Sequence, residues 1–347
     1  MACKVGVVGA GGAGRLLHLP ALKEVEEVEV VALCDAREDR VKEVAGQFGI
    51  PKTFTDYKEM LKEDLDIVTI GLPNFLHAEV ACAALEAGKH VVVEKPLANN
   101  LESARRMVET AEKAGKNLFM AVQNRQRLRV KMVREMVLNG RMGEVYHAAC
   151  SIHRRRGYPG MGSWFTNKEL SGGGCLLDIG VHVLDMTWYM CAEPKPLRAT
   201  GMTYAKFGHV ERKPSNFGDF DPDGVVDVDD FAAGLIVCEG GLSIALSVSW
   251  AANGQQSGFK VDIYGTRAGA SYDPFVIYGE EKGVVTDTVP QIRDDFNAYA
   301  EEMRHYVDVC AGKAEPAVTP HSALTVQAML DALYRSSKEG REVKVEV

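Results

Sequence analysis

The chain has 347 residues, of which 46% are hydrophobic and 25% charged, and its formal net charge is −8 at pH 7. This length suits two domains better than a single core. The acidic balance excludes a protein that binds nucleic acid through its phosphates, because that function needs a basic face. The one basic cluster, residues 153–156, is too short to supply such a face, and we expect it to meet solvent or to line the mouth of a substrate site.

The sequence also argues against a secreted or membrane protein. Its first residues, "MACKVGVVGAGGAG", pass directly into a strand and a glycine turn, and no apolar run is long enough to span a bilayer. The eight cysteines are scattered, with no Cys-x-x-Cys pair, and several lie within apolar runs. We therefore expect a cytoplasmic protein with no membrane partner, no disulfide framework and no metal site.

Residues 1–122 alternate short apolar runs with helical patterns. Helical spacing with capping residues and terminal glycines predicts helices over 74–88 and 99–115. The apolar runs are continuous rather than alternating, as parallel strands covered on both faces require; they are 4–11, 28–35, 66–73, 89–96 and 117–124. The order strand, helix, strand predicts an α/β fold in which a doubly wound parallel sheet, a Rossmann domain, binds a dinucleotide.

The pattern changes at about residue 123, and 123–347 is predicted to be an α+β domain for substrate binding and oligomerisation. Helices are expected over 130–140, 176–190 and 320–336. Strand patterns joined by short turns predict an open, mainly antiparallel sheet with helices on one face; they cover 144–154, 198–208, 228–241, 241–254, 258–266, 274–281 and 342–347. A polar stretch, 209–224, is expected to be a long loop.

One of these strands suggests how copies of the chain would associate. Ile244, Leu246, Val248 and Trp250 alternate with smaller residues. If the sheet is open, this row would be exposed and would require a partner. We therefore expect a homodimer or homotetramer formed through the C-terminal sheet.

The first strand leads into a G-x-G-x-x-G turn, residues 9–14, which opens the helical stretch 15–22. The glycines allow a tight turn, a close approach to a pyrophosphate and close helix–strand packing, and the helix N-terminus favours the anion. Asp35 ends the second strand about 20 residues later, where a carboxylate can bind both ribose hydroxyls. A carboxylate there repels a 2′-phosphate and favours NAD, while Arg37 works against this preference. NAD is expected ahead of NADP.

Polar groups follow two later strands, at the sheet edge where ligands bind in such folds. One strand ends at Pro73, Asn74 and His77, and the next ends at Glu94-Lys95-Pro96. Lys95 has an alternative explanation, because a lysine at a strand end can simply extend to solvent. Glu94 either pairs with Lys95 or bonds nucleotide or backbone.

The expected helix over 176–190 carries Asp178 and His182 four residues apart, hence on one face. This arrangement fits a plain surface pair, and Asp185 is another candidate partner for the histidine. Two ligands without a third at close spacing make a poor metal site. Three glycines lead the chain into this helix at 172–174.

Taken together, these residues resemble the Gfo/Idh/MocA oxidoreductases, the family of glucose–fructose oxidoreductase and inositol dehydrogenase. The likeness rests on the glycine turn, Glu94-Lys95-Pro96, and Gly173-Gly174 followed by Asp178 and His182, and it runs over nearly the whole chain. It implies that Lys95, Asp178 and His182 form the catalytic trio and that Pro96 is a frequently cis proline. Leu72 replaces the threonine of the family's Thr-Pro-Asn turn.

The resemblance also assigns binding residues. Asn124 and Arg125 match an Asn-Arg pair near the nicotinamide or substrate, and 155–165 resembles a segment found in sugar-oxidising members. The expected cofactor ligands are Gly9, Gly11, Gly12, Ala13, Gly14, Asp35, Arg37, Pro73, Asn74, His77, Glu94, Lys95 and Asn124. The expected substrate ligands are Lys95, Arg125, Arg156, Tyr158, Trp164, Asp178 and His182.

The function implied is an NAD-dependent dehydrogenase of a sugar, sugar derivative or cyclitol. His182 is the expected base because its unperturbed pKa lies near neutrality, and Lys95 would stabilise the developing alkoxide. Asp178 would orient the trio. Two other functions remain open: a glycosidase that uses tightly held NAD within one catalytic cycle, and a non-catalytic NAD- or sugar-sensing regulator.

Overall fold

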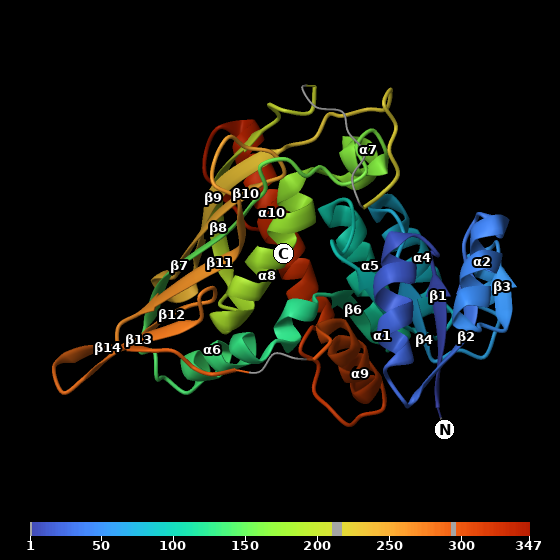
Figure 1. Ribbon diagram of the computed structural model, residues 1–347, viewed down its shortest axis with the longest axis horizontal. Helices are drawn as coiled ribbons and strands as arrows, with labels where there is room; N and C mark the ends of the chain where they lie inside the picture. Colours follow the sequence, from blue (N-terminus) through green and yellow to red (C-terminus); the bar gives the residue numbers. More distant parts are fainter. Residues whose placement is uncertain (1, 210–216, 293–295) are drawn as a thin grey trace. The chain divides into compact units, whose positions relative to one another are not determined.

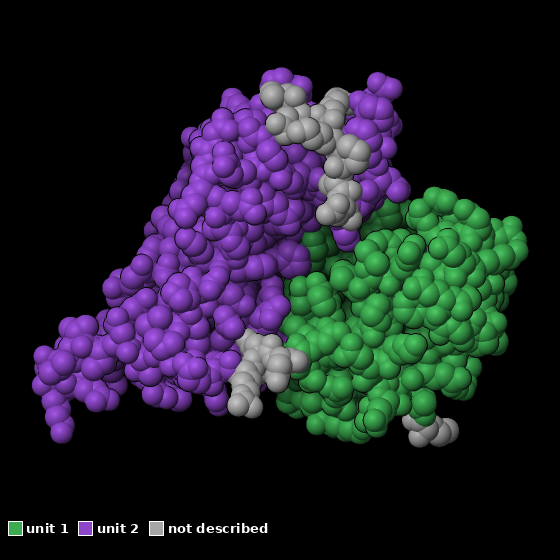
Figure 2. Space-filling view, in the orientation of Figure 1, with its two compact units in different colours: residues 1–123, 296–324 green, residues 124–295, 325–347 purple. Residues whose placement is uncertain are grey.

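The computed structural model describes residues 2–209, 217–292 and 296–347, so seven residues of the predicted loop over 209–224 lie outside the described residues. The chain divides into two compact units, 1–123 with 296–324 and 124–295 with 325–347 (Figure 2). The predicted boundary after residue 122 differs from this division in one respect, because the segment 296–324 returns to the first unit. Within the described residues, no helix is both long and apolar enough to cross a membrane.

A six-stranded, entirely parallel sheet forms the centre of the first unit, in the order β3-β2-β1-β4-β5-β6 (Figure 1). This confirms the predicted Rossmann sheet, and all four residues of both β4 and β6 are buried. The strands are β1 (Cys3–Val8), β2 (Val28–Cys34), β3 (Lys52–Phe54), β4 (Ile67–Ile70), β5 (His90–Glu94) and β6 (Leu118–Ala121). The edge strand β3 was not predicted, since three largely exposed residues leave no apolar run.

Helix α5 (Leu101–Ala114) begins and ends at the expected capping residues. The Asn100 side chain accepts a hydrogen bond from the Ser103 N–H (2.8 Å) at the start of α5, and Gly115 ends that helix at φ 61°. Both are the residue types that satisfy helix ends. The helical elements are η1 (Gly14–His18, a π-helical turn), α1 (Leu19–Lys23), α2 (Glu38–Phe48), α3 (Tyr57–Met60), α4 (Asn74–Glu86) and α5 (Leu101–Ala114).

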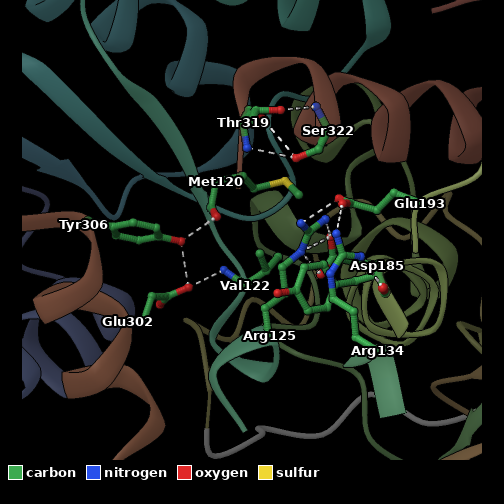
Figure 3. A network of polar contacts seen from close by, with 11 residues as sticks. Met120, Val122, Arg125, Arg134, Asp185, Glu193, Glu302, Tyr306, Thr319 and Ser322 are labelled. Carbon is green, nitrogen blue, oxygen red and sulfur yellow. Dashed lines mark hydrogen bonds and ion pairs between the residues drawn. The ribbon is translucent and has the colours of Figure 1, made fainter. Parts of the chain in front are cut away.

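Helix α9 (Ala298–Cys310) packs beside the last strand of this sheet and explains why the return segment belongs to the first unit. The Tyr306 ring stacks on Phe119 with centroids 4.4 Å apart, and its hydroxyl donates to the Met120 carbonyl (3.0 Å). The Glu302 carboxylate accepts hydrogen bonds from the Val122 N–H and the Tyr306 hydroxyl (Figure 3). Glu302 is 1% exposed, and its Oε1 thus has two hydrogen-bond donors at the end of β6.

A nine-stranded sheet forms the second unit, in the order β14-β13-β12-β11-β7-β10-β9-β8-β15. Among the described strands of this second sheet, only β7 and β10 pair in parallel. The predicted, mainly antiparallel character of the sheet is therefore confirmed. The strands are β7 (Val145–His153), β8 (Pro196–Tyr204), β9 (Phe231–Cys238), β10 (Ser243–Ser249), β11 (Ser257–Gly265), β12 (Gly269–Ser271), β13 (Val276–Glu281), β14 (Val284–Thr288) and β15 (Val343–Lys344).

Helices cover one face of this sheet. The Leu333 side chain of α10 lies against Gly201 and Gly234, where an added Cβ would come within 3 Å of it. Helix α8 packs on β7 and β11, and α6 packs on α8 (Figure 1). The helical elements are η2 (Gln123–Gln126), α6 (Leu128–Leu138), η3 (Trp164–Thr166), α7 (Lys168–Ser171), η4 (Leu176–Gly180, a π-helical turn), α8 (Val181–Met190), η5 (Glu239–Gly241) and α10 (Pro320–Glu339), which the division into units splits after Leu324.

The row predicted to be an exposed interface is instead part of the core. Ile244, Leu246, Val248 and Trp250 are all at most 3% exposed. They face the helices of their own unit, where Val248 lies beside Gly180 at the end of η4. The prediction that this row requires a partner was therefore wrong, because alternation identifies one buried face without saying what buries it.

Candidate active site

The glycine turn of the first unit has the geometry of a cradle for a phosphate group. Gly9 has φ 104°, and a Cβ there would lie 2.4 Å from the Gly71 carbonyl oxygen. A Cβ on Gly14 would lie 1.8 Å from the Gly9 carbonyl oxygen. At Gly11 a Cβ would meet nothing closer than the Arg40 guanidinium at 3.7 Å. Packing within the chain thus requires glycine at the first and last positions, while the middle position is open to a ligand.

Two further residues complete this turn. Gly12 begins the helical backbone, and Ala13 is helical, with φ −66° and ψ −51°. Their N–H groups belong to the start of a helix, where donors lack intrahelical partners and attract anions. Gly9, Gly11, Gly12, Ala13 and Gly14 therefore fit the pyrophosphate role predicted for them.

Asp35 lies directly beside the glycine turn. Its carboxylate accepts hydrogen bonds from the Ala10 N–H (2.8 Å) and from the Arg37 N–H (2.9 Å). The Arg37 guanidinium turns to Asp39, with Nη2 2.8 Å from Oδ2. The carboxylate at the end of β2 is thus fixed in place, and the nearby cation is paired with a carboxylate of its own.

At the end of β5, Glu94-Lys95-Pro96 is held from within the same unit. The Lys95–Pro96 peptide bond is cis. Glu94 Oε1 lies 3.0 Å from His18 Nε2, and Glu94 Oε2 accepts a hydrogen bond from the Lys95 N–H (3.2 Å). Of the roles left open for Glu94, the structure therefore shows a hydrogen bond with the backbone. Glu94 also contacts His18, which the sequence analysis did not single out.

The structure corrects the role predicted for His77. Its ring is fully buried, with Nε2 2.9 Å from the Leu72 carbonyl oxygen and Nδ1 3.0 Å from the Pro96 carbonyl oxygen. Burial lowers the pKa of His77, and its contacts with these two carbonyls oppose that shift. Both ring nitrogens therefore face backbone, and the side chain links the ends of β4 and β5 instead of reaching a nucleotide. Pro73 and Asn74 stand at the start of α4, with Asn74 buried.

In the second unit, Asp178 lies in the π-helical turn η4 and His182 follows in α8. The Trp250 indole Nε1 donates to Asp178 Oδ2 (2.9 Å), and the Phe259 ring meets the His182 ring edge to face. π-Helical turns occur frequently at functional sites. The sequence did not single out this contact of Trp250, because the strand pattern shows only that the residue is apolar.

Arg125 has a different role from the one predicted. The side chain is fully buried, and its Nε and Nη2 groups donate to Asp185 while Nη1 donates to Glu193 Oε1 (2.9 Å; Figure 3). Glu193 also pairs with Arg134 (2.9 Å). This environment contradicts the prediction that Arg125 binds substrate, because its charge is already matched inside the unit. It also removes Asp185 from consideration as the partner of His182.

The remaining predicted ligands fall into two groups by exposure. Asn124 is buried, and its side-chain oxygen accepts a hydrogen bond from Arg127 Nε (3.2 Å). Tyr158 is buried, and its hydroxyl donates to Asp230 Oδ2 (2.8 Å). Arg156 is exposed, lies over the Phe207 ring and donates to the Asn253 side chain, and Trp164 stacks on Phe165.

Comparison with known proteins shows which protein family the chain belongs to. The profile of an oxidoreductase family with an NAD-binding Rossmann fold matches residues 3–122, and the C-terminal domain profile of GFO/IDH/MocA proteins matches residues 130–271. The D-glucoside 3-dehydrogenase of Escherichia coli is 33% identical over 344 residues, which cover 99% of this chain and 97% of that protein. The chain belongs to the Gfo/Idh/MocA family. It is an NAD(P)-dependent oxidoreductase, a dehydrogenase acting on CH–OH groups.

Other Gfo/Idh/MocA members show the breadth of the group. The myo-inositol 2-dehydrogenase of Thermotoga maritima is 26% identical over 354 residues, covering 99% of this chain and 98% of that one. A solved levoglucosan dehydrogenase in complex with NADH has a TM-score of 0.88 at 21% identity and covers 100% of both chains. This likeness confirms the fold. Within the present chain, Lys95 belongs to the first unit, and Asp178 and His182 belong to the second.

Proposed function

We propose that this enzyme oxidises a secondary ring hydroxyl of a sugar, a sugar derivative or a cyclitol and delivers the hydride to NAD. The observation that carries the proposal is the placement of Lys95 directly after the carboxyl end of β5, where its N–H donates to the Glu94 carboxylate. Ligands of open α/β sheets bind at this edge. Lys95 is only partly exposed, and a lysine at this edge can direct its ammonium group to a bound ligand.

In the proposed reaction, the substrate carbon loses a hydride and its hydroxyl loses a proton, so the alcohol becomes a ketone. His182 takes the proton. Lys95 donates a hydrogen bond to the same oxygen and stabilises its developing negative charge. Asp178, held by Trp250, orients the substrate by accepting from a neighbouring hydroxyl. NAD, when bound, supplies the hydride acceptor.

The residues of the first unit support NAD as the cofactor. Gly11 leaves room for a pyrophosphate, and Asp35 stands beside that turn as a carboxylate suited to two ribose hydroxyls. Asp35 disfavours a 2′-phosphate, and the cation nearest in sequence, Arg37, is paired with Asp39. We therefore propose NAD rather than NADP, with Asn74 and Glu94 at the nicotinamide end of the site.

For the substrate, we propose a D-glucoside or a related pyranoside. The D-glucoside 3-dehydrogenase is 33% identical over nearly the full length of both chains, and relatives named for levoglucosan and myo-inositol match this chain at 28% and 26% identity. Arg156 and Trp164, in the Gly- and aromatic-rich segment before the Asp178 helix, are proposed to line the substrate mouth, and the buried Tyr158 is proposed to support this segment through its hydrogen bond to Asp230. Aromatic faces of this kind bind sugar rings through their apolar sides.

The proposal is tested by identifying the nucleotide released on denaturing the purified protein and then measuring NADH absorbance with D-glucosides, free sugars and inositols. Net reduction of added NAD by a D-glucoside is the expected result. If an aryl glucoside releases its phenol with no net NADH, the redox-assisted glycosidase takes the place of the dehydrogenase. If nucleotide binds but no member of the panel is converted, the proposal of a dehydrogenase gives way to that of a non-catalytic regulator.

A further inference from the structure

The carboxylate of Asp229 lies at the start of the helical segment that carries Asp178 and His182. Asp229 is 7% exposed, and its two oxygens accept hydrogen bonds from three chemically different kinds of donor. Oδ1 accepts from the Gly174 N–H (2.8 Å) and the Tyr334 hydroxyl (2.8 Å). Oδ2 accepts from the Leu176 N–H (2.9 Å) and the Cys175 thiol (3.3 Å). The side chain therefore satisfies N–H groups that a helix start leaves without partners.

The backbone of Asp229 holds the same turn. Its carbonyl oxygen accepts from the Cys175 N–H (2.9 Å), and a Cβ added to Gly174 would lie 1.9 Å from that oxygen. Glycine at this position is thus explained by close contact with Asp229. The turn over 174–176 is bound through both the main chain and the side chain of one residue.

We propose that Asp229 is a positioning residue for the reaction, since it fixes the turn from which Asp178 and His182 project. The Asp178 N–H donates to the Gly174 carbonyl (2.9 Å), so a shift of the turn is passed to Asp178 within one helical turn. This inference rests on the proposed function of the Asp178–His182 pair. Misplacing a catalytic group by about 1 Å can lower a rate ~10²-fold.

The neighbouring Asp230 restrains Asp178 by a second route. Its carbonyl oxygen accepts from the Trp250 N–H (2.9 Å), and the Trp250 indole in turn donates to Asp178 Oδ2 (2.9 Å). Its carboxylate accepts from the Tyr158 hydroxyl (2.8 Å), and the Tyr158 and Trp250 rings lie 5.6 Å apart. One dipeptide, Asp229–Asp230, therefore holds the turn before Asp178 and the side chain that binds Asp178.

The pKa values of the two side-chain donors to Asp229 are both raised. Burial, reinforced by the Asp229 charge, raises the pKa of the Cys175 thiol and of the Tyr334 hydroxyl well above their usual values. Each therefore keeps the proton that it donates. Because these contacts and two backbone N–H groups occupy both carboxylate oxygens, Asp229 acts through the helix and not on the substrate.

The test compares Asp229→Asn with a matched control, Asp227→Asn. Asp227 lies two residues away and also accepts a backbone hydrogen bond, from the Lys168 N–H (2.7 Å), but its partner begins the separate helix α7. We expect Asp229→Asn to lower kcat ~10- to 100-fold with the Kd for NADH unchanged, because the proposed nucleotide ligands Gly9–Gly14 and Asp35 lie in the other unit. Asp227→Asn should keep wild-type kcat. A wild-type kcat in Asp229→Asn would overturn the inference.

A second comparison separates positioning from general destabilisation. Tyr334→Phe removes only one of the donors to Asp229, and we expect a smaller fall both in kcat and in the unfolding midpoint than in Asp229→Asn. In a His182→Ala background, Asp229→Asn should lower the remaining rate by less than it does in the wild type, since residues acting as one unit are not additive. Equal factors in both backgrounds would contradict a role through His182.

Hydrogen exchange keeps this inference distinct from the proposed function. In Asp229→Asn we expect the amides of residues 174–182 to lose protection, whereas those of α9 in the first unit should keep theirs. If the wild-type enzyme converts no sugar or cyclitol, that result refutes the proposed function but not the structural role of Asp229. Unchanged protection of 174–182 would end the inference about Asp229, whatever the activity.

Discussion

His18 and Glu94 are 76 residues apart in sequence, yet His18 Nε2 lies 3.0 Å from Glu94 Oε1 in the first unit. His18 is the last residue of the π-helical turn that follows the glycine turn, and Glu94 is the last residue of β5. The second oxygen of the same carboxylate accepts from the Lys95 N–H. The Glu94 side chain thus joins the π-helical turn that follows the glycine turn to the backbone of the proposed catalytic lysine.

Glu94→Ala should therefore impair the reaction without removing any group that touches substrate. We expect kcat to fall about tenfold or more through displacement of Lys95, and stability to fall by roughly 1–3 kcal/mol because a buried His18 loses its partner. Glu94→Gln keeps an acceptor for the Lys95 N–H and a polar group for His18, so its kcat should lie between that of Glu94→Ala and that of the wild type. Steady-state kinetics and thermal unfolding measure both effects. Equal kcat for Glu94→Ala and the wild type would show that this link has no role in turnover.

Substitution of the proposed acid–base groups should lower turnover far more. Lys95→Ala and His182→Ala are each expected to reduce kcat by roughly 10²–10⁴, with affinity for NAD little changed. Lys89→Ala is the matched control for the first, because Lys89 precedes the opposite end of β5 and donates to the Glu63 carbonyl (3.0 Å). Stopped-flow NADH formation and nucleotide titration separate the two quantities. Turnover like the wild type in both variants would refute the assignment.

The sequence predicted those parts of the fold in which the local spacing of apolar residues shows which residues are buried. Continuous apolar runs gave five of the six strands of the first sheet, and capping residues such as Asn100 and Gly115 marked helix ends. Strand β3 was missed because a short edge strand buries too little to leave a pattern. Ile244 to Trp250 were recognised as one face, but which helices cover that face depends on residues far away in sequence.

The site shows the same division. Local pattern drew attention to Lys95 after an apolar strand and to Asp178 and His182 on one helix face, but only the family resemblance joined the three as a proposed catalytic trio. The roles of His77 and Arg125 could not be obtained in this way, since each depends on distant partners: backbone carbonyls for His77, and Asp185 and Glu193 for Arg125. His18 lies in an apolar helical stretch and was not singled out, because the sequence does not show that Glu94, 76 residues away, is its partner.

Cofactor preference should depend on Asp35. Asp35→Ser removes the carboxylate that would repel a 2′-phosphate, and the Arg40 guanidinium, which reaches the glycine turn, would then be available to that phosphate. We expect the ratio of kcat/KM for NADP to that for NAD to rise by about tenfold or more. Asp64→Ser serves as control, because Asp64 pairs with Lys4 at the start of β1 and lies away from the turn. An unchanged ratio in Asp35→Ser would show that another residue sets the preference.

The buried cluster around Arg125 should contribute to stability and not to substrate affinity. Arg125→Met leaves Asp185 buried without its cation, and breaking such a pair from one side costs roughly 3–5 kcal/mol. All three tryptophans, Trp164, Trp188 and Trp250, lie in the second unit, so their fluorescence during urea unfolding reports on that unit. Glu193 loses less, because it keeps its pair with Arg134.

Two further variants make the Arg125 prediction specific. Adding Asp185→Leu to Arg125→Met should recover part of the lost stability, because replacing both members of a buried pair with apolar groups removes the unmatched charge. Arg127 lies two residues after Arg125, and Arg127→Met, which removes a hydrogen bond to the Asn124 side chain, should shift the urea midpoint far less. A substrate ligand would behave in the opposite way: Arg125→Met would then raise KM for the sugar while leaving the fluorescence midpoint where it is in the wild type.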